Sequence, residues 1–212
     1  MSLAPPDRIE TEADLGLGAA VLVARDARFA PILAETGPLP LRRRPDGFAA
    51  LLAAIVGQQV STASAAAILG RLEAAGYAEE GAVLTASDED LRACGLSRPK
   101  LRYIRALAEA RLDYAGLRSE PTDVVVERLV ALPGIGRWTA EIYAMFALGH
   151  VDAFPAGDLA LQVAAARAFG LSARPSEARL RAMAEDWSPV RAVAACALWA
   201  YYRLDTSREG VL

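Results

Sequence analysis

The 212-residue sequence is poor in the residues on which several protein classes depend. Its two cysteines, Cys94 and Cys196, are too few for a disulfide-stapled scaffold or for a cluster held by four cysteine ligands. Lysine occurs once, at Lys100, beside 22 arginines, and histidine occurs once, at His150. The sequence therefore excludes a disulfide-rich domain and leaves one lysine amine as a candidate nucleophile.

No apolar run reaches the roughly 18 residues that a membrane-spanning helix needs, and the first ten residues lack the apolar segment of a signal peptide. We therefore expect no membrane contact and a cytoplasmic location. The net charge is −3 and the pI is near 5.3, so any contact with nucleic acid must depend on a local basic surface. The hydrophobic content of 54% excludes a disordered chain.

Alanine and leucine, which are strong helix formers, dominate the sequence, and no long stretch alternates with a period of two. Turn residues separate the helical segments, and the sequence predicts an all-α fold. The predicted helices cover residues 17–26, 28–35, 48–57, 61–75, 85–93, 98–114, 122–131, 137–148, 158–169, 176–187 and 189–203.

The most informative stretch is Leu-Pro-Gly-Ile-Gly-Arg-Trp-Thr-Ala at residues 132–140. Pro133 ends the preceding helix, and Gly134 and Gly136 leave the backbone bare. The next helix starts at once, so its first N–H groups point out of the turn and favour an anion such as phosphate. Ile135 is expected to anchor the turn in the core. The glycine spacing alone is equally consistent with an ordinary corner between two helices.

This stretch resembles the helix–hairpin–helix motif of the HhH-GPD superfamily of DNA base-excision glycosylases. Further segments resemble elements of that family, and of its alkyladenine branch, in the family's own order. They are Leu52–Ser61 with its Gln-Gln-Val-Ser sequence, Gly95–Lys100, Val151–Gln162, Trp187–Arg191 and Leu198-Trp199. The resemblance implies that residues 1–212 form one glycosylase unit, a two-lobed helical bundle with its active cleft between the lobes. We expect residues 1–47 and 170–212 in one lobe, and residues 48–169, with hairpin 132–136, in the other.

The resemblance identifies Asp158 as the catalytic carboxylate, since it lies twenty residues after Trp138. Such a carboxylate would stabilise an oxocarbenium-like sugar and orient or deprotonate a water. The residue pattern also fits Asp158 as a helix N-cap, and the two roles are compatible. Asp152 is the rival carboxylate and is expected to be a loop residue.

The position of Trp138 is the one at which bifunctional members of the family carry a nucleophilic lysine, whereas Lys100 lies in a different element. We therefore expect a monofunctional enzyme without lyase activity. Trp138 and Trp199 are the expected walls of the base pocket, because electron-rich rings attract a cationic alkylated purine. Trp187 and Tyr143 are expected in the core.

The resemblance also implies a side chain that fills the gap left by a flipped nucleotide, and Gln59, with Gln58 beside it, is the candidate plug. Five basic residues and no acid lie between residues 91 and 105, which suggests a phosphate-binding face or an ordinary solvated helix face. The expected contacts with the DNA backbone are Gly134, Gly136, Arg137, Thr139, Arg98 and Lys100. Lys100 is equally consistent with a solvated surface charge.

The expected partner is damaged double-stranded DNA, from which the enzyme would excise alkylated purines of the 3-methyladenine and 7-methylguanine type. We expect it to act as a monomer, at the nucleoid if the source is bacterial. No cofactor is expected apart from a monovalent cation, Na⁺ or K⁺, at the backbone carbonyls of Leu132, Gly134 and Ile135. Two alternatives stay open. One is a non-catalytic helix–hairpin–helix module in which Asp158 is only a cap, and the other is a glycosylase for neutral lesions such as hypoxanthine or ethenoadenine.

Overall fold

The structure, a computed structural model, describes the backbone of residues 4–209 and the side chains of residues 4–204. Within this range the chain forms thirteen α-helices, one 3₁₀ turn and no strand, with an isolated antiparallel bridge between Arg8 and His150. The predicted all-α class is confirmed. None of the helices in the described range is long and apolar enough to cross a lipid bilayer.

The chain divides into two compact units. Unit 1 comprises residues 1–43 and 144–212, and unit 2 comprises residues 44–143. The sequence led us to expect the second boundary at residue 169, and the observed one lies at residue 143. The reason is packing: α11 (Leu159–Ala168) lies against the C-terminal helix α13 (Arg191–Glu209), so the segment before it belongs with the terminal helices.

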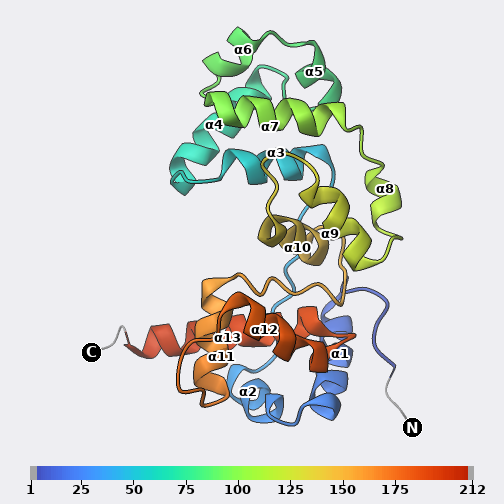
Figure 1. Ribbon diagram of the computed structural model, residues 1–212, viewed down its shortest axis with the longest axis vertical. Helices are drawn as coiled ribbons and strands as arrows, with labels where there is room; N and C mark the ends of the chain where they lie inside the picture. Colours follow the sequence, from blue (N-terminus) through green and yellow to red (C-terminus); the bar gives the residue numbers. More distant parts are fainter. Residues whose placement is uncertain (1–3, 210–212) are drawn as a thin grey trace. The chain divides into compact units, whose positions relative to one another are not determined.

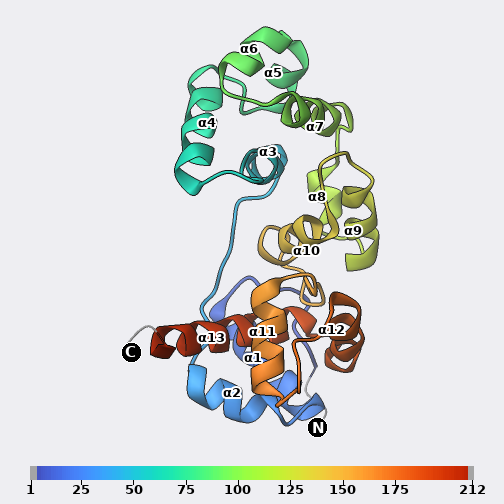
Figure 2. The ribbon, with the colours of Figure 1, turned by 60° about the vertical axis from the view of Figure 1, so that its left-hand side comes forward.

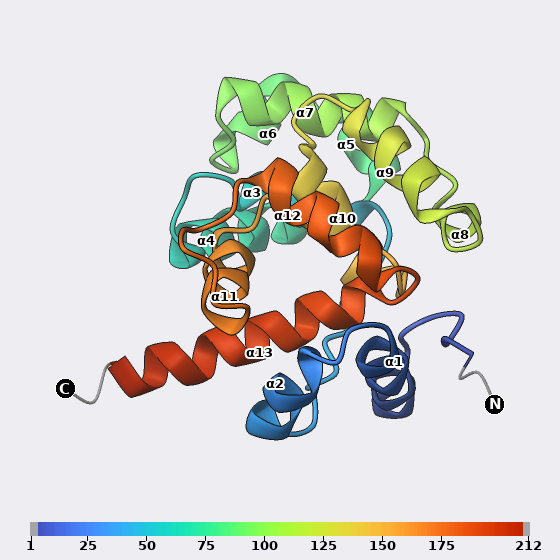
Figure 3. The same ribbon diagram turned by 60° about the horizontal axis from the view of Figure 1, so that its bottom comes forward.

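Unit 1 is built around α13, which packs against α11, α1 and α2 (Figure 3). The buried part of α13 is rich in alanine, and small side chains let neighbouring helices approach it closely. At Gly18 of α1, for example, an added Cβ would lie 2.6 Å from a methyl group of Val193. The other helices of this unit are α1 (Glu12–Arg25), α2 (Phe29–Thr36), α12 (Glu177–Ala184) and the 3₁₀ turn Glu185–Trp187.

An aromatic cluster centred on Trp187 closes the core of unit 1. Trp187 is fully buried, and its ring meets Phe29 and Phe154 edge to face at centroid distances of 5.2 and 5.5 Å. Its indole N–H donates to Asp26 at 3.0 Å, which satisfies the one polar atom of the side chain. The predicted core role of Trp187 is therefore confirmed.

Unit 2 is organised by α7 (Arg98–Glu109), which packs against α3, α5 and α6 (Figures 1 and 2). Its buried residues Leu101, Ile104 and Leu107 recur every three positions, so one face of the helix enters the core. Tyr143 is buried, as predicted, and its hydroxyl accepts the N–H of Gly47 at 2.9 Å. The remaining helices are α3 (Phe48–Val56), α4 (Thr62–Ala74), α5 (Glu80–Thr85), α6 (Asp88–Ala93), α8 (Tyr114–Leu117), α9 (Thr122–Val130) and α10 (Arg137–Phe146), the last of which continues into unit 1.

Several helix limits differ from those predicted. Helix α1 begins at Glu12 and not at Leu17, because Thr11 and Asp14 form a reciprocal capping box. Helix α7 ends at Glu109, five residues before the predicted end. Helices α5 and α8 were not predicted; they are six and four residues long, too short for a clear periodic pattern.

Candidate active site

Asp158 lies at the start of α11, where its side chain accepts hydrogen bonds from a backbone N–H and from an indole N–H. The backbone N–H of Leu161 donates to Oδ1 at 3.1 Å, which makes Asp158 the N-cap of the helix. The indole N–H of Trp199, on α13, donates to the same oxygen at 3.1 Å. The structure thus brings together two of the predicted site residues, and the two donors fix the orientation of the carboxylate.

The loop that leads to Asp158 is held by its own hydrogen bonds. The N–H of Asp158 donates to the carbonyl of Pro155 at 2.9 Å, and the side chain of Gln162 donates to the carbonyl of Ala156 at 3.0 Å. A Cβ on Gly157 would lie 3.1 Å from the carboxylate of Glu177, so α12 passes close to the loop. The backbone before the candidate catalytic group is therefore closely confined.

Trp199 is itself supported by Phe146. Their ring centroids are 5.8 Å apart and the planes are tilted by 31°. Trp199 is half-buried, so the contact with Phe146 and the hydrogen bond to Asp158 together restrict the indole on two sides.

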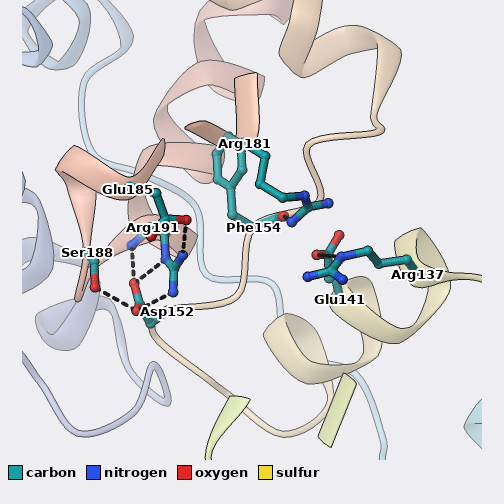
Figure 4. A network of polar contacts seen from close by, with 8 residues as sticks. All are labelled: Arg137, Glu141, Asp152, Phe154, Arg181, Glu185, Ser188 and Arg191. Carbon is teal, nitrogen blue, oxygen red and sulfur yellow. Dashed lines mark hydrogen bonds and ion pairs between the residues drawn. The ribbon is translucent and has the colours of Figure 1, made fainter. Parts of the chain in front are cut away.

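Asp152, the rival carboxylate, forms an ion pair with Arg191. Arg191 binds both of its oxygens, with Nε at 2.9 Å and Nη2 at 2.8 Å, and the hydroxyl of Ser188 donates at 2.9 Å (Figure 4). Glu185 takes a third N–H of the guanidinium at 2.8 Å. Burial alone lowers the pKa of Arg191, but the bonds and charges of Asp152 and Glu185 raise it above its ordinary value. This network fits a structural role for Asp152.

The hairpin Leu132–Gly136 lies in unit 2 and leads directly into α10. Gly134 has φ = +85°, a backbone conformation that favours glycine, and Ile135 is buried, as predicted. A Cβ on Gly134 would overlap the ring of Tyr103 on α7, so the hairpin is pressed against that helix. Trp138, in the first turn of α10, is 47% exposed.

An ion pair that was not predicted joins the first turn of α10 to the second. Arg137 donates to the carboxylate of Glu141 at 3.0 Å, and Glu141 is buried (Figure 4). The four-residue spacing between an arginine and a glutamate was the available signal. Thr139 is half-buried in the first of these turns. Arg137 therefore has a carboxylate partner, while its own side chain remains 56% exposed.

The two candidate plug residues lie in the turn 57–61, which follows α3 and which we call the wedge turn. Gln58 is half-buried, and its side-chain N–H donates to the carbonyl of Gly134 at 2.7 Å. Gln59 is exposed and has φ = +56°, a conformation that few residues other than glycine adopt. The structure thus separates the pair: Gln58 contacts the hairpin and Gln59 projects from the turn.

The five basic residues between 91 and 105 have different environments. Lys100 donates to the carbonyl of Val56 at 2.7 Å, and Arg105 donates to the carbonyls of Val83 and Ala86 and pairs with Asp88. The other three are exposed, and none of the ion pairs among the described residues uses them. They line a surface concavity of about 530 Å³, whose lining is Arg92, Arg98, Arg102, Pro99, Leu101, Asp88 and Glu89.

The hairpin carbonyls were the expected ligands of a monovalent cation. Two of the three already accept hydrogen bonds: that of Gly134 from the side chain of Gln58 at 2.7 Å, and that of Leu132 from the N–H of Ile135 at 3.1 Å. An amide hydrogen at the Gly134 oxygen carries positive partial charge and competes with a cation there. Each of these oxygens keeps a second lone pair, so the cation site stays a prediction.

Comparisons with known proteins identify the family of the chain. Residues 52–189 match the family described as "HhH-GPD superfamily base excision DNA repair protein". The crystal structure of a DNA-3-methyladenine glycosidase from Bacillus halodurans is similar to this chain, with 33% identity and a TM-score of 0.82, covering 94% of this chain and 92% of that one. The 3-methyladenine DNA glycosylase Mag1 of Schizosaccharomyces pombe, solved in complex with abasic DNA, is 26% identical with a TM-score of 0.68, covering 86% of this chain and 94% of its own. The alkylbase DNA glycosidase-like protein mag2 of the same yeast is 27% identical over 82% of this chain and 87% of its own.

Proposed function

The chain belongs to the HhH-GPD superfamily of base excision DNA repair proteins, as the sequence predicted, and from this premise we propose that it is a monofunctional DNA glycosylase for alkylated purines. It would act as a monomer on damaged double-stranded DNA and release bases of the 3-methyladenine and 7-methylguanine type by hydrolysis. The observation that carries the proposal is the Asp158–Trp199 pair, which orients a carboxylate beside an aromatic ring.

The proposed chemistry follows from that pair. Cleavage of the bond between base and sugar develops positive charge on the deoxyribose. The Asp158 carboxylate, oriented by the N–H groups of Leu161 and Trp199, would stabilise this charge and orient or deprotonate the attacking water. An alkylated purine is itself cationic and leaves readily, so the reaction needs no general acid.

Aromatic side chains would select the cationic base. The indole of Trp199 is held by Asp158 and Phe146, and that of Trp138 is 47% exposed on α10. A cation over the face of an indole gains about 0.5–2 kcal/mol relative to a neutral ring, depending on desolvation. We assign both tryptophans to base recognition, with charged lesions preferred over neutral ones.

Gln59 is the proposed plug, because it is exposed and projects from the end of α3. The backbone of Gly134 and Gly136, with Arg137 and Thr139 of α10, would contact phosphates through the N–H groups at the helix start. These contacts would fix the position of the DNA backbone, and the base itself would be read elsewhere.

The test of the proposed function is a substrate panel. Duplexes that contain 3-methyladenine, 7-methylguanine, hypoxanthine or ethenoadenine are incubated with the protein in excess, and the released base is measured. Faster release of the two charged bases supports the proposal. Preferential release of hypoxanthine or ethenoadenine indicates a glycosylase for neutral lesions, and no release from any duplex indicates a non-catalytic DNA-binding module.

The monofunctional assignment predicts that borohydride traps no covalent complex between protein and DNA. A trapped adduct requires a lysine or other amine that forms a Schiff base with the sugar, and the single lysine donates to the carbonyl of Val56. The measurement is gel analysis of reactions on 3-methyladenine duplex after borohydride treatment, with a known bifunctional glycosylase as positive control. Any trapped adduct would contradict the assignment, and its loss in Lys100→Met would identify the amine.

The arginines of the concavity on α7 are predicted to contact phosphates and so to contribute to the salt dependence of DNA affinity. Replacing both Arg98 and Arg102 by methionine is expected to reduce the slope of log K against log salt by about two, because each arginine would neutralise one phosphate. The measurement is fluorescence anisotropy of an abasic-analogue duplex at about 50 to 200 mM salt, the range over which affinity that depends on phosphate contacts falls steeply. Arg25→Met, an exposed arginine on α1, is the matched control and should leave the slope unchanged. Equal slopes for the double variant and the control would show that the concavity binds no phosphate.

A further inference from the structure

The wedge turn and the hairpin, far apart in the sequence, are held against the same helix of unit 2. The side chain of Gln58 donates to the carbonyl of Gly134 at 2.7 Å, which joins the turn to the hairpin. The hairpin also meets the ring of Tyr103, which a Cβ on Gly134 would overlap, so α7 and the hairpin are in close contact. A displacement of the hairpin would therefore be transmitted to the wedge turn.

Lys100, also on α7, holds the end of α3 at the start of the wedge turn. Its ammonium group donates to the carbonyl of Val56 at 2.7 Å, and Val56 is the last residue of that helix. The carbonyls at a helix C-terminus lack intrahelical partners, and a cation there is favoured by the helix dipole. The lysine is half-buried, and the carbonyl belongs to a fully buried residue. The single lysine of the chain thus binds the helix end from which this turn begins.

The wedge turn has an unfavourable backbone conformation directly after these two contacts. Gln59 has φ = +56°, and a residue other than glycine stays in such a conformation only when its surroundings determine it. Both contacts lie before Gln59 in the chain: Lys100 donates to the carbonyl of Val56, and the adjacent Gln58 donates to the carbonyl of Gly134. They restrict the backbone that leads to the exposed Gln59.

We propose that Lys100 and Gln58 are positioning residues that pre-form the wedge turn, so that Gln59 enters the DNA stack without the cost of ordering its backbone on binding. The inference rests on the proposed function, since it takes Gln59 as the plug. Preorganisation of this kind improves binding by removing an entropic cost and adds no new contact with DNA. Lys100 therefore acts through Gln59 and not on a phosphate.

The test is a double-mutant cycle that combines Lys100→Met with Gln59→Ala. Lys100→Met alone is expected to reduce both single-turnover excision and abasic-DNA affinity about tenfold, which corresponds to about 1.4 kcal/mol. In the Gln59→Ala background the same change should have no further effect, because the side chain that it positions is gone. Fluorescence of 2-aminopurine opposite an abasic analogue reports insertion directly, and its rise on binding should be lost in either single variant. Lys100→Arg keeps a cationic donor and should restore most of the signal.

A matched variant and a second arm separate positioning from other causes. Arg102→Met removes the same charge from the same helix, and it should lower the salt slope without losing the 2-aminopurine signal. Gln58→Met should reproduce the non-additivity with Gln59→Ala, even if Lys100→Met folds poorly in thermal melts.

Each other outcome has a separate meaning. Additive effects of Lys100→Met and Gln59→Ala, or a Lys100→Met effect that is only a change in salt slope, would overturn the inference and leave the glycosylase assignment intact. Full activity of Gln59→Ala would show that Gln59 is not the plug and would overturn the inference. A wild-type protein that excises no base would instead refute the proposed function.

Discussion

Asp158→Asn is expected to lower the single-turnover rate of base excision by about 10²- to 10³-fold, the loss that follows removal of one preorganised electrostatic partner of a transition state. Asparagine retains the oxygen that accepts the N–H groups of Leu161 and Trp199, and it is as good an N-cap as aspartate. The substitution therefore removes the negative charge and leaves the start of α11 in place. Thermal unfolding and affinity for an abasic-analogue duplex should both stay close to the wild-type values.

Asp152→Asn is the matched control, because it makes the same chemical change at the rival carboxylate. Asp152 is bound by Arg191 at 2.8 Å and by Ser188 at 2.9 Å, so its loss should destabilise the fold by about 1–3 kcal/mol. The excision rate per folded molecule should be unchanged. The rates are measured with enzyme in excess over a 3-methyladenine duplex, at a temperature well below both melting transitions.

The two variants can also reverse the assignment. Full activity of Asp158→Asn would mean that Asp158 is only a cap and that another group stabilises the charged sugar. Loss of activity in Asp152→Asn without loss of stability would move the catalytic role to that residue. The control is informative because the two carboxylates are only six residues apart in the sequence. The sequence alone does not say which of them lies near the substrate.

Local interactions of the site were predictable from the sequence. The N-cap role of Asp158 depends on an N–H three residues further on, and the buried position of Ile135 depends on the glycines beside it. The resemblance to the family added Asp158, Trp199 and Gln59 as site candidates. These predictions required only short spacings or matched motifs.

Partners that come from distant segments were not predictable. Lys100 and Val56 are 44 residues apart, and Gln58 and Gly134 are 76 residues apart, so no periodic pattern relates them. A lysine on a helix that is otherwise rich in arginine suggested a phosphate contact, and only the packing of α7 on α3 shows that its ammonium lies at a helix end. The same packing divides the basic run into two residues that hold carbonyls and three that line a concavity.

Gly134→Ala is expected to destabilise the protein by about 2–5 kcal/mol, which is a large part of the stability of a typical domain. Its φ of +85° costs an alanine about 1–2 kcal/mol, and the overlap of a Cβ with the Tyr103 ring forces repacking that costs about 1–3 kcal/mol. The strain and the overlap should displace the hairpin. Affinity for abasic-analogue DNA should therefore fall at least about tenfold. Chemical denaturation and anisotropy are the two measurements.

Gly136→Ala separates strain from contact with DNA. Nothing lies within 4 Å of a Cβ at Gly136, and the φ of this residue is not in the left-handed region. The free energy of unfolding of Gly136→Ala should therefore differ from the wild-type value by less than about 0.5 kcal/mol. If the hairpin backbone approaches phosphate there, the added methyl group should still weaken DNA binding. Unchanged DNA affinity of Gly136→Ala would remove that residue from the interface.

Combining Gly134→Ala with Tyr103→Leu then separates the two costs at Gly134. The smaller side chain relieves the overlap but cannot change the backbone angle, so about 1–2 kcal/mol of destabilisation should remain. Recovery of DNA affinity in the double variant would show that the contact between Tyr103 and the hairpin, and not the turn conformation, sets where the hairpin lies. Because Gln58 donates to the carbonyl of the same glycine, recovery should extend to the 2-aminopurine signal of Gln59. A hairpin that regains its affinity while Gln59 stays disengaged would instead mean that the wedge turn is held by Lys100 alone.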